Sequence, residues 1–541
     1  MFLGVDAGGT NLDVVLADRQ GIISTYKMSG DLGDGFVDAV EETAGEVLSE
    51  LERVVVASTR VLNADVQDRL PDCTNVLVPG VGLSPELGFQ GERNVVVDGC
   101  IDHRGRETEE VDEEKLTSLD TETATAAVTA KFGVRNPETE NEAREQLERS
   151  GKFEAISIGH AATGTPGFPS RAGTAVANAK AMPTFREVAD AVESGVDHLD
   201  VDARVYFLKG DGGTVTSEHG REAPGYTVGG GPSASTMGLL ALMRREDLDS
   251  EDALLVDVGG TTTDITAVRD GNPVMGSGST IDGIETRYNA ADSLDLPYGG
   301  DTAVGDDGLT RYREGNAAAF GGEVPTLTDA LNDAERLDIG DMGKSREALE
   351  CLAVDPSDVF EEYYDAMSTA VENFVARLDF SPSRMVLGGV LAEAVSEGIA
   401  RNLDFITEAV VPEYADVAGA VGCAASRPSV RTDVYVDTAR AQISVTPGGV
   451  EATVERGEEF TSSEARKLVE RCAVAASVGG NVDDERASGY SDGVSSEPNV
   501  EMQEFENYNV VQKSRKRGEI IDAAAQKEPG LADYVESWGE S

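Results

Sequence analysis

The amino-acid sequence predicts an α/β protein made of two similar lobes, because one strand–turn–strand pattern occurs twice. Residues 254–268 read Leu-Leu-Val-Asp-Val-Gly-Gly-Thr-Thr-Thr-Asp-Ile-Thr-Ala-Val, and residues 3–16 read Leu-Gly-Val-Asp-Ala-Gly-Gly-Thr-Asn-Leu-Asp-Val-Val-Leu. In each copy two apolar runs of β type flank a turn that contains paired glycines. An internal repeat indicates related structural units, and strand runs alternate with helical segments elsewhere in the chain. We therefore expect two α/β lobes, each of which begins with a hairpin.

Both hairpins carry the same chemical groups at the same spacing, which predicts phosphate binding. Asp6 corresponds to Asp257, and Asp13 corresponds to Asp264. Glycine lets backbone N–H groups approach a phosphate without a Cβ in the way, and Asp6 and Asp257 are candidates to hold Mg2+ through water. One copy alone is equally well explained as an ordinary hairpin turn, whereas two copies favour phosphate binding. The predicted phosphate-binding residues are Gly8, Gly9, Thr10, Asn11, Asp13, Gly259, Gly260, Thr261, Thr262 and Asp264.

Other nucleotide-binding patterns fit the sequence less well. A Gly-x-Gly-x-x-Gly turn after a strand is absent, which argues against a Rossmann dinucleotide site. Gly343-Lys344-Ser345 resembles the end of a Walker A loop, but Asp338 stands where that loop needs its first glycine.

The composition is strongly acidic along the whole length of the chain. The 541 residues include 100 acidic and 45 basic ones, which gives a formal net charge of −55. Such a charge argues against nucleic acid and anionic membrane surfaces as partners. It is typical of proteins from a salt-loaded cytoplasm, where ions screen the repulsion. The five cysteines form no Cys-x-x-Cys pair and no signal-peptide pattern opens the sequence, so we expect a reduced, cytoplasmic protein.

The N-terminal elements follow from short apolar runs and from helical spacing. The first hairpin spans 2–7 and 12–17, and an amphipathic helix is predicted at 34–51. Predicted strands lie at 54–57, 75–78, 94–97, near 127–134, at 155–159 and at 204–208. The acidic stretch 109–149 is predicted to be mostly helical, and helices are also predicted at 173–181, 184–194 and 229–243.

The C-terminal elements follow in the same way. In Pro-Thr-Leu-Thr-Asp at 325–329, either Thr328 or Asp329 is the expected helix N-cap. A long helix is predicted at 358–378, a strand ending in paired glycines at 385–390, and a helix of small residues at 417–425, which packs closely on a neighbouring lobe or simply fills the core. Residues 432–456 predict two strands around a turn at 446–449. A helix is predicted at 462–475, and a mobile loop is predicted in the polar stretch 479–506.

Several polar residues follow strands and are candidates for the substrate side. Thr59 and Asn63 lie beyond the strand 54–57, where open α/β sheets place ligands; helix capping is the alternative. His160 follows the strand 155–159 and is a candidate for proton transfer, although a hydrogen bond to a loop carbonyl explains it equally well. The further candidates are Asp102 and His103 in a turn, which are more often structural there, and Gly300 and Asp301 in a glycine-rich turn.

The two hairpins and the late Leu-Gly-Gly turn resemble the actin-like ATPase superfamily, which has a ribonuclease H-like fold. Several further motifs resemble the hydantoinase/oxoprolinase family, in particular its ATP-binding A-type subunit. These motifs are Asp257-Val-Gly-Gly-Thr-Thr-Thr-Asp264, Asp102-His-Arg-Gly105, Phe132-Gly-Val-Arg-Asn-Pro137, Gly159-His160, Gly173-Thr-Ala-Val-Ala-Asn-Ala179 and Pro325-Thr-Leu-Thr-Asp-Ala330. The sequence departs from the family pattern at Gly230-Gly231-Pro232-Ser233, Ser58-Thr59-Arg60 and Ala161–Gly164, near the presumed substrate side.

The resemblance implies an ATP- and Mg2+-dependent hydrolase that opens a cyclic amide such as a hydantoin or 5-oxoproline, together with a B-type subunit. It implies catalytic roles for Asp6, Asp257 and His160, metal binding by Asp6 and Asp257, and adenosine contact by Gly388 and Gly389. The implied domains are an N-terminal domain at 1–185, an ATPase core at 186–430 and a small α+β region at 431–541. Two alternatives are a ketone carboxylase-type ATP-binding subunit and a chaperone-like ATPase that reactivates a partner enzyme.

Overall fold

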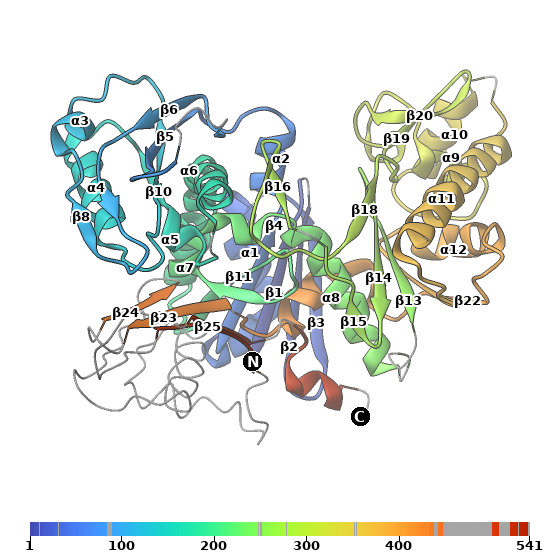
Figure 1. Cartoon of the computed structure of the whole chain (residues 1–541). Coiled ribbons are helices and arrows are strands. Elements are labelled where there is room, and N and C mark those ends of the chain that lie inside the picture. The colour runs from blue at the N-terminus through green and yellow to red at the C-terminus, as the bar shows by residue number, and fades with distance from the viewer. Residues whose placement is uncertain are drawn as a thin grey trace.

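The computed structural model shows two α/β lobes side by side, with an outer subdomain attached to the first lobe (Figure 1). It describes residues 1–429 apart from Thr10, Asp31, 84–88, Pro166, Asp247, 249–251, Ser277, Cys351 and Ala353, and also 431–437, 442–446, 500–507, 520–527 and 530–538. None of the helices in these ranges is long and apolar enough to cross a membrane.

The first lobe is built on a six-stranded sheet in the order β12-β11-β4-β1-β2-β3. Its strands are β1 (Phe2–Ala7), β2 (Asn11–Ala17), β3 (Ile22–Ser29), β4 (Arg53–Ser58), β11 (Arg204–Leu208) and β12 (Thr214–Thr216). The first three strands form an antiparallel meander, while β4 runs parallel to both β1 and β11. The helices α1 (Leu32–Ala44) and α6 (Phe168–His198) pack on the sheet through a shared apolar core, and α2 (Arg60–Val66) follows β4.

The outer subdomain has a four-stranded, fully parallel sheet in the order β10-β9-β5-β6. The strands are β5 (Cys73–Val78), β6 (Arg93–Val96), β9 (Thr125–Ala130) and β10 (Ala155–Ile158). The helices α3 (Glu113–Thr117) and α4 (Glu138–Ser150), the short helical turn α5 (Gly159–Ala162) and the strand pair β7 (Cys100–Ile101) and β8 (Glu107–Glu109) complete it.

The second lobe repeats the central part of the first. Its sheet has the order β15-β14-β13-β21-β22, and β18 also pairs with β14. The strands are β13 (Ala253–Val258), β14 (Thr263–Arg269), β15 (Asn272–Pro273), β18 (Ser293–Leu296), β21 (Arg384–Gly388) and β22 (Glu408–Val410). Hairpin β13–β14 with parallel β21 matches hairpin β1–β2 with parallel β4, so the two-lobe prediction is confirmed.

Helices cover the outside of the second lobe. They are α9 (Leu327–Asp333), α10 (Met342–Glu350), α11 (Pro356–Leu378) and α12 (Ala392–Arg401), and the hairpin β19 (Thr302–Gly305) and β20 (Gly308–Arg313) lies beside them (Figure 1). The N-cap of α9 is Thr326, whose side chain and the carboxylate of Asp329 form a capping box. The predicted caps, Thr328 and Asp329, are therefore wrong, because Asp329 serves as the third residue of the helix.

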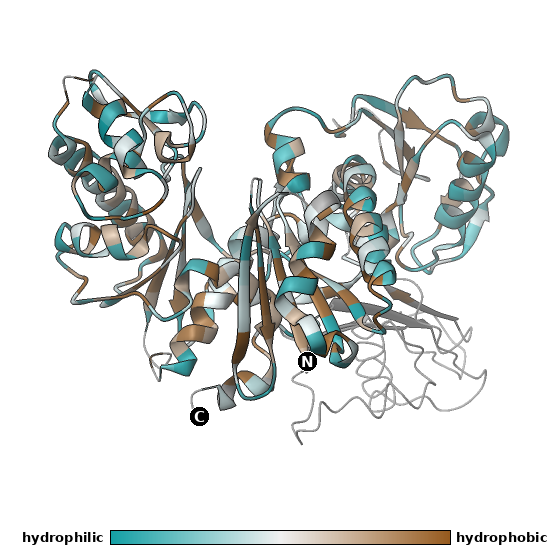
Figure 2. Cartoon of the chain, turned by 180° about the vertical axis from the view of Figure 1, so that it is seen from behind, coloured by the Kyte–Doolittle hydropathy of each residue, from teal (hydrophilic) through white to brown (hydrophobic). Residues whose placement is uncertain are grey.

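Two helices of small residues cross between the lobes. In α8 (Gly230–Arg245) and α13 (Ala418–Ala425), Cβ atoms added at Gly238 and Gly422 would lie only 1.8 and 1.9 Å from backbone oxygens of the opposite helix. The apolar core around this crossing joins residues of both sheets, and Figure 2 shows apolar colour along the inner elements. The prediction that the helix at 417–425 packs closely on a neighbour is confirmed.

Two segments tie distant parts of the chain to the first lobe. The small hairpin β16 (Thr280–Ile281) and β17 (Ile284–Glu285), which follows β14 and β15, places Ile281 and Ile284 in the first-lobe core. Near the other end of the sequence, the 3-10 turn η5 (Asp533–Ser537) places Tyr534 against the ring of Phe2, with 4.4 Å between ring centroids. The indole nitrogen of buried Trp538 donates a hydrogen bond to the carbonyl oxygen of Asp18 at 3.0 Å.

Several predicted helices differ from the structure. The predicted helix at 34–51 ends at Ala44 and continues as the 3-10 turn η1 (Gly45–Glu50), because Gly45 adopts a φ of +48°. Residues 109–149 are less helical than predicted, because only α3 and α4 are helices there, while β9 is the strand that was predicted near 127–134. The helices predicted at 173–181 and 184–194 are one helix, α6, which contains Pro183; burial of much of its surface offsets the lost backbone bond. The predicted boundary at 185/186 lies inside this helix.

The C-terminal region forms an antiparallel sheet in the order β24-β23-β26-β25. Its strands are β23 (Arg431–Asp437), β24 (Gln442–Thr446), β25 (Val500–Asn507) and β26 (Ile520–Lys527). The two strands do not flank residue 446 as predicted, because β23 and β24 already pair between Asp437 and Gln442 and Thr446 ends β24; residues 447–449 of the predicted turn lie outside the described residues. The end of the predicted mobile loop, 500–506, is strand, whereas the helix predicted at 462–475 and the rest of that loop lie outside the described residues.

Candidate functional site

The two repeated hairpins have turns with the same backbone geometry. The backbone N–H of Gly8 donates to the carbonyl oxygen of Asn11 at 3.0 Å, and that of Gly259 donates to Thr262 at 3.0 Å. Each turn is thus closed three residues after its first glycine and leaves the intervening residues at the tip. Thr10 lies outside the described residues.

Four partly buried carboxyl groups lie at the bases of these turns. Asp6 pairs with Asp13 across the first hairpin, and Asp257 pairs with Asp264 across the second. Burial, followed by the charges of Asp13 and Asp257, raises the pKa of Asp6 to about 8. Because Asp6 responds to Asp257, the two hairpins face each other closely enough to share one electrostatic site.

The other three carboxyl groups are also harder to ionise than usual. Burial raises the pKa of Asp13 to about 6, although Lys27 opposes this. Burial also raises the pKa of Asp257, against a hydrogen bond from Ser235. The pKa of Asp264 is raised by burial and then by Asp295, its neighbour on β18. The cluster therefore favours a cation or protons.

The carboxyl groups suit Mg2+, which takes most of its ligands from water and phosphate, better than a cation whose ligands all come from the protein. The ammonium of Lys27 lies 3.1 Å from Asp13 Oδ2, while the buried Oδ1 of Asp13 has no hydrogen-bond partner. In the described part of the chain, no group of three or more His, Cys, Asp or Glu side chains is placed to hold a metal. Mg2+ commonly takes one or two carboxylates and completes its shell with water and phosphate oxygens. Asp6 and Asp257 would hold the ion in this way.

Glycines near the carboxylates allow backbone to approach them closely. Gly389 has a φ of +89°, and a Cβ there would lie 2.2 Å from the carbonyl oxygen of Val258 and 3.1 Å from Asp257 Oδ1. A Cβ at Gly419 would lie 2.0 Å from Asp6 Oδ2. The predicted Gly388–Gly389 pair thus lies beside the second hairpin, and Gly419, which the sequence analysis did not single out, lies beside the first.

Two of the predicted substrate-side residues lie beside the first hairpin. Thr59 donates its backbone N–H to the carbonyl oxygen of Ala7 at 3.3 Å, and its hydroxyl accepts a hydrogen bond from the side chain of Asn63 at 3.1 Å. A Cβ added at Gly9 would lie 3.8 Å from Asn63 Nδ2. Thr59 is the N-cap residue of α2, but its side chain makes no capping hydrogen bond.

Gly300 and Asp301 instead brace the second hairpin. Their backbone N–H groups donate to the carbonyl oxygens of Gly259 at 3.0 Å and Gly260 at 2.6 Å. The carboxylate of Asp301 forms an ion pair with Arg313 at 3.1 Å. Burial raises the pKa of Asp301, and Arg313 opposes that shift.

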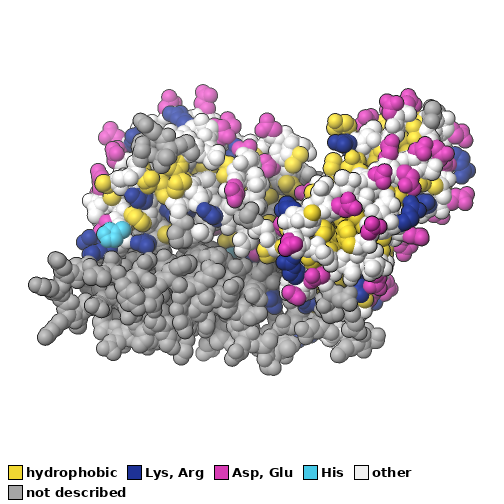
Figure 3. Space-filling model, turned by 45° about the vertical axis from the view of Figure 1, so that its right-hand side comes forward, with side chains coloured by type: hydrophobic (Ala, Val, Ile, Leu, Met, Phe, Trp, Pro, Cys, Tyr) yellow, Lys and Arg dark blue, Asp and Glu magenta, His cyan; other side chains and the backbone are white. Residues whose placement is uncertain are grey.

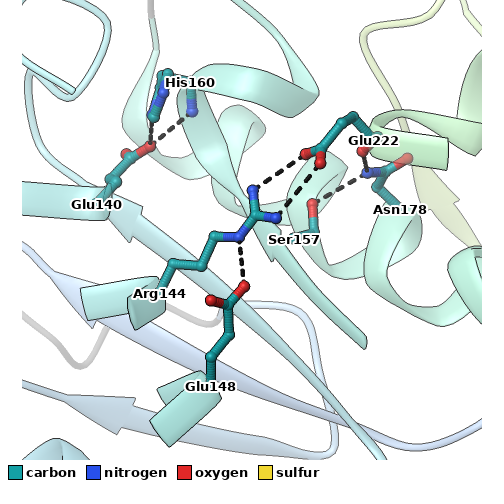
Figure 4. Close-up of polar contacts among 7 residues, drawn as sticks. All are labelled: Glu140, Arg144, Glu148, Ser157, His160, Asn178 and Glu222. Atoms are coloured by element: carbon teal, nitrogen blue, oxygen red, sulfur yellow. Dashed lines mark hydrogen bonds and ion pairs between the residues drawn. The ribbon is translucent and has the colours of Figure 1, made fainter. Parts of the chain in front are cut away.

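His160 belongs to a buried polar cluster in the outer subdomain (Figure 4). Its backbone N–H and its Nδ1 both lie 2.7 Å from Glu140 Oε2 on α4. Burial opposes ionisation of Glu140, but His160 and Arg171 together hold its pKa below the usual range. On the same helix, Arg144 bridges Glu148 and Glu222, which helps to fix α4 to α7 (Ser217–Glu222). In the part of the chain that the structure describes, these hydrogen bonds of His160 go to Glu140 and not to either repeated hairpin.

Asp102 and His103 also lie in the outer subdomain. The carboxylate of Asp102 accepts hydrogen bonds from the backbone N–H groups of Arg104 and Arg106 and forms an ion pair with the Arg106 side chain. These bonds, which outweigh partial burial, lower the pKa of Asp102. The carbonyl oxygen of His103 accepts a hydrogen bond from Arg135. The turn is thus closed by its own contacts.

Sequence reasoning missed several polar or charged side chains near the carboxyl cluster and the second turn. Lys27 on β3, Ser235 on α8, Asp295 on β18 and Arg313 on β20 come from elements whose position only the tertiary structure sets. Their signal in the sequence is weak, because Lys27, Asp295 and Arg313 belong to no repeated or glycine-rich motif; Ser235 alone follows one, at 229–231. Asp295 alone follows from the pairing of β14 with β18.

Two family models match this chain. Residues 171–432 match the model described as hydantoinase/oxoprolinase, and residues 2–151 match the model described as its N-terminal region. Caprolactamase subunit alpha of Pseudomonas jessenii is 23% identical over 377 residues, which are 61% of this chain and 53% of that protein. The match therefore spans about half the length of this relative.

Two solved structures share the fold over nearly the whole chain. Nucleotide-free acetone carboxylase has a TM-score of 0.72 at 16% identity, covering 99% of this chain and 88% of that chain. The ATP-dependent caprolactamase from Pseudomonas jessenii has a TM-score of 0.62 at 16% identity, covering 97% and 87%. At these identities the likeness shows the fold alone, and the chemistry has to be inferred from the site.

Proposed function

Because the chain belongs to the hydantoinase/oxoprolinase family, we propose that it is an ATP-dependent hydrolase subunit that opens a cyclic amide. Its two-lobed fold is that of the actin-like ATPases. The observation that carries the proposal is the pair of matching glycine turns above four partly buried carboxyl groups that lie near one another. This arrangement suits a triphosphate with its cation, bound from both lobes.

The chemistry explains why such a reaction uses ATP. A cyclic amide of the hydantoin or 5-oxoproline type is stable because its nitrogen is a poor leaving group. Transfer of the γ-phosphoryl group to the amide oxygen gives an activated imidate that water attacks. Phosphoryl transfer depends mainly on positioning and on neutralisation of charge, which glycine turns and a cation supply.

The residues at the two turns would divide this work. Backbone N–H groups at the tips hold the phosphates, while Asp6 and Asp257 orient Mg2+, which neutralises phosphate charge when it is bound. Gly388 and Gly389 leave room for the adenosine end of the nucleotide. Thr59 and Asn63 are the better placed of the predicted substrate-side residues, because they lie beside Gly9. Asp102, His103 and His160 lie in the outer subdomain and keep their predicted substrate role as a hypothesis only.

A second subunit belongs to the proposal. The relative described above is the alpha subunit of a caprolactamase, which supports a partner subunit; the family resemblance makes that partner one of the B type, for the hydrolytic step. A ketone carboxylase-type subunit, which phosphorylates an enol oxygen, is the second candidate, because acetone carboxylase matches the fold with a TM-score of 0.72.

The test measures ATP turnover by the full chain in molar KCl, with Mg2+, with and without the B-type subunit. The substrates are hydantoin, 5-oxoproline, caprolactam and acetone. We expect one cyclic amide to stimulate turnover, while stimulation by acetone alone would favour the second candidate.

We predict that Asp257→Ala abolishes Mg2+-dependent ATP binding or turnover without unfolding the chain, because one of the two cation-facing carboxylates is lost. Asp404→Ala, an exposed position of the same lobe, is the matched control and should behave as wild type. Wild-type turnover by Asp257→Ala, with circular dichroism unchanged, would refute the nucleotide site.

A further inference from the structure

Arg313, at the end of β20, places a guanidinium group against the second glycine turn. One of its terminal nitrogens lies 3.3 Å from the hydroxyl of Thr261, a residue at the tip of that turn. The other lies 3.1 Å from Asp301 Oδ2 and 2.7 Å from Asn316 Oδ1. Its Nε donates to the carbonyl oxygen of Gly315 at 3.2 Å. The side chain is 27% exposed, so it is held in place and still reaches solvent.

The turn does not need Arg313 to keep its shape. The backbone bonds from Gly300 and Asp301 to Gly259 and Gly260 brace it, as does the bond from Gly259 to Thr262. A Cβ at Gly299 would lie within 2.7 Å of the carbonyl oxygens of Gly259 and Gly260, so backbone packs directly on backbone there. The guanidinium group adds charge to a turn that is already fixed.

Phosphate oxygens need positive charge, which the carboxyl groups of the site do not supply. The side chains beneath the two turns are carboxyl groups, and Lys27 is engaged by Asp13 at the first hairpin. A phosphoryl group in transfer spreads negative charge over its three outer oxygens. A guanidinium fork binds two such oxygens at once, and Asp301 would hold that fork ready while no phosphate is present.

We propose that Arg313 is a catalytic residue whose guanidinium group contacts the γ-phosphoryl group during its transfer; this rests on the proposed function. In that step the bond between the γ-phosphorus and the β,γ-bridging oxygen breaks, and ADP leaves with its electron pair. A new phosphorus–oxygen bond forms to the amide oxygen or, in uncoupled hydrolysis, to water, whose proton passes to solvent. Arg313 exchanges no proton and stabilises the charge on the outer oxygens.

The experiment compares Arg313→Ala and Arg313→Lys with wild type in the full chain. Arg311→Ala, an exposed arginine two residues earlier on the same strand, is the matched control. We expect Arg313→Ala to lower the kcat for ATP about 100-fold, with the Kd for Mg·ADP within about threefold of wild type and an unchanged Tm. Arg313→Lys should recover little activity, because an ammonium cannot bridge two oxygens.

Two readouts separate a catalytic role from a structural one. Added guanidinium chloride, at concentrations that leave the fold intact, should restore part of the turnover of Arg313→Ala and none in Arg313→Lys. Mg·ADP with aluminium fluoride, which mimics the phosphoryl group in transfer, should bind Arg313→Ala much more weakly than wild type. Wild-type kcat in Arg313→Ala, or equal loss of ADP and ADP–aluminium fluoride binding, would overturn the inference. A wild-type chain that neither binds nor hydrolyses ATP would instead overturn the proposed function.

Discussion

At the scale of single residues, Asp6 makes the stability of the folded chain depend on pH. The carboxyl group is buried beside Asp13 and within the field of Asp257, so its pKa rises to about 8 from an ordinary value of 3.8. Between these two pH values the native chain keeps a proton that the unfolded chain releases. Stability from this group is therefore full below pH 4 and is lost as the pH rises toward 8.

We predict that Asp6→Asn removes this pH dependence, since the amide has nearly the same shape and does not titrate. In urea unfolding at pH 5, 6, 7 and 8 with EDTA present, the unfolding free energy of the variant should increase relative to that of wild type as the pH rises. The gain should be on the order of 1 kcal/mol per pH unit. Added Mg2+ should narrow the difference by stabilising the ionised wild type. Parallel stability curves for the two proteins would contradict this account.

Part of the site could be predicted residue by residue. The repeated acids and glycines are visible in the sequence because local spacing alone defines a hairpin turn. Lys27, Ser235 and Arg313 were not predicted, because their roles depend on which distant strands and helices meet. His160 was predicted from its position after a strand. Its hydrogen bonds to Glu140, a residue of the preceding helix α4, could not be seen from that local pattern.

At the scale of elements, the sequence predicted strands and long helices better than their ends. The apolar runs of β1 and β13 sufficed because both strands are buried on all sides. Pro183 suggested a break in α6 that tertiary burial overrides. The turn after β23 was misplaced because Thr446-Pro447-Gly448-Gly449 carries a stronger local turn signal than the residues that join β23 to β24.

We predict that the crossing of α8 and α13 does not tolerate a methyl group. In Gly238→Ala the new Cβ would meet the carbonyl oxygen of Ala418 at 1.8 Å, and in Gly422→Ala it would meet that of Ala234 at 1.9 Å. Because both obstacles are backbone atoms, each change should cost about 3 kcal/mol or more of unfolding free energy. Urea denaturation measures the loss.

The control for this prediction is Gly343→Ala. Gly343 is an exposed helical glycine of α10, and its nearest obstacle is the side-chain oxygen of Asp341 at 3.1 Å. The variant should stay within about 1 kcal/mol of wild type. Equal effects at Gly238 and Gly343 would show that the crossing is less tightly packed than the structure indicates.

At the scale of the whole molecule, acidic side chains are distributed over the visible surface of both lobes (Figure 3). Many of the ion pairs that offset them lie at the surface, such as Arg401 with Glu361 and Arg149 with Glu145. Exposed pairs of this kind contribute little stability. The net charge of −55 therefore leaves a large repulsion, which solvent ions must screen.

We predict that the Tm rises by several degrees as KCl increases from roughly 0.1 to 1 M, since the screening length falls from about 10 to about 3 Å. Scanning calorimetry measures the Tm. Sucrose at matched osmolality is the control, because it favours compact states without screening charge. A Tm that rises equally with sucrose and with KCl, or that does not change with KCl, would show that charge repulsion does not limit stability.

The contact of Tyr534 and Trp538 with the first hairpin can form only late in the synthesis of the chain. Phe2 and Asp18 leave the ribosome early, but their partners follow more than 500 residues later along the chain. At about 5–20 residues per second, the delay is on the order of half a minute to two minutes. During that interval the apolar side of β1 that faces η5 lacks this cover. The nascent chain thus carries its first hairpin with an exposed apolar face, and a chaperone that binds such faces would have its longest opportunity there.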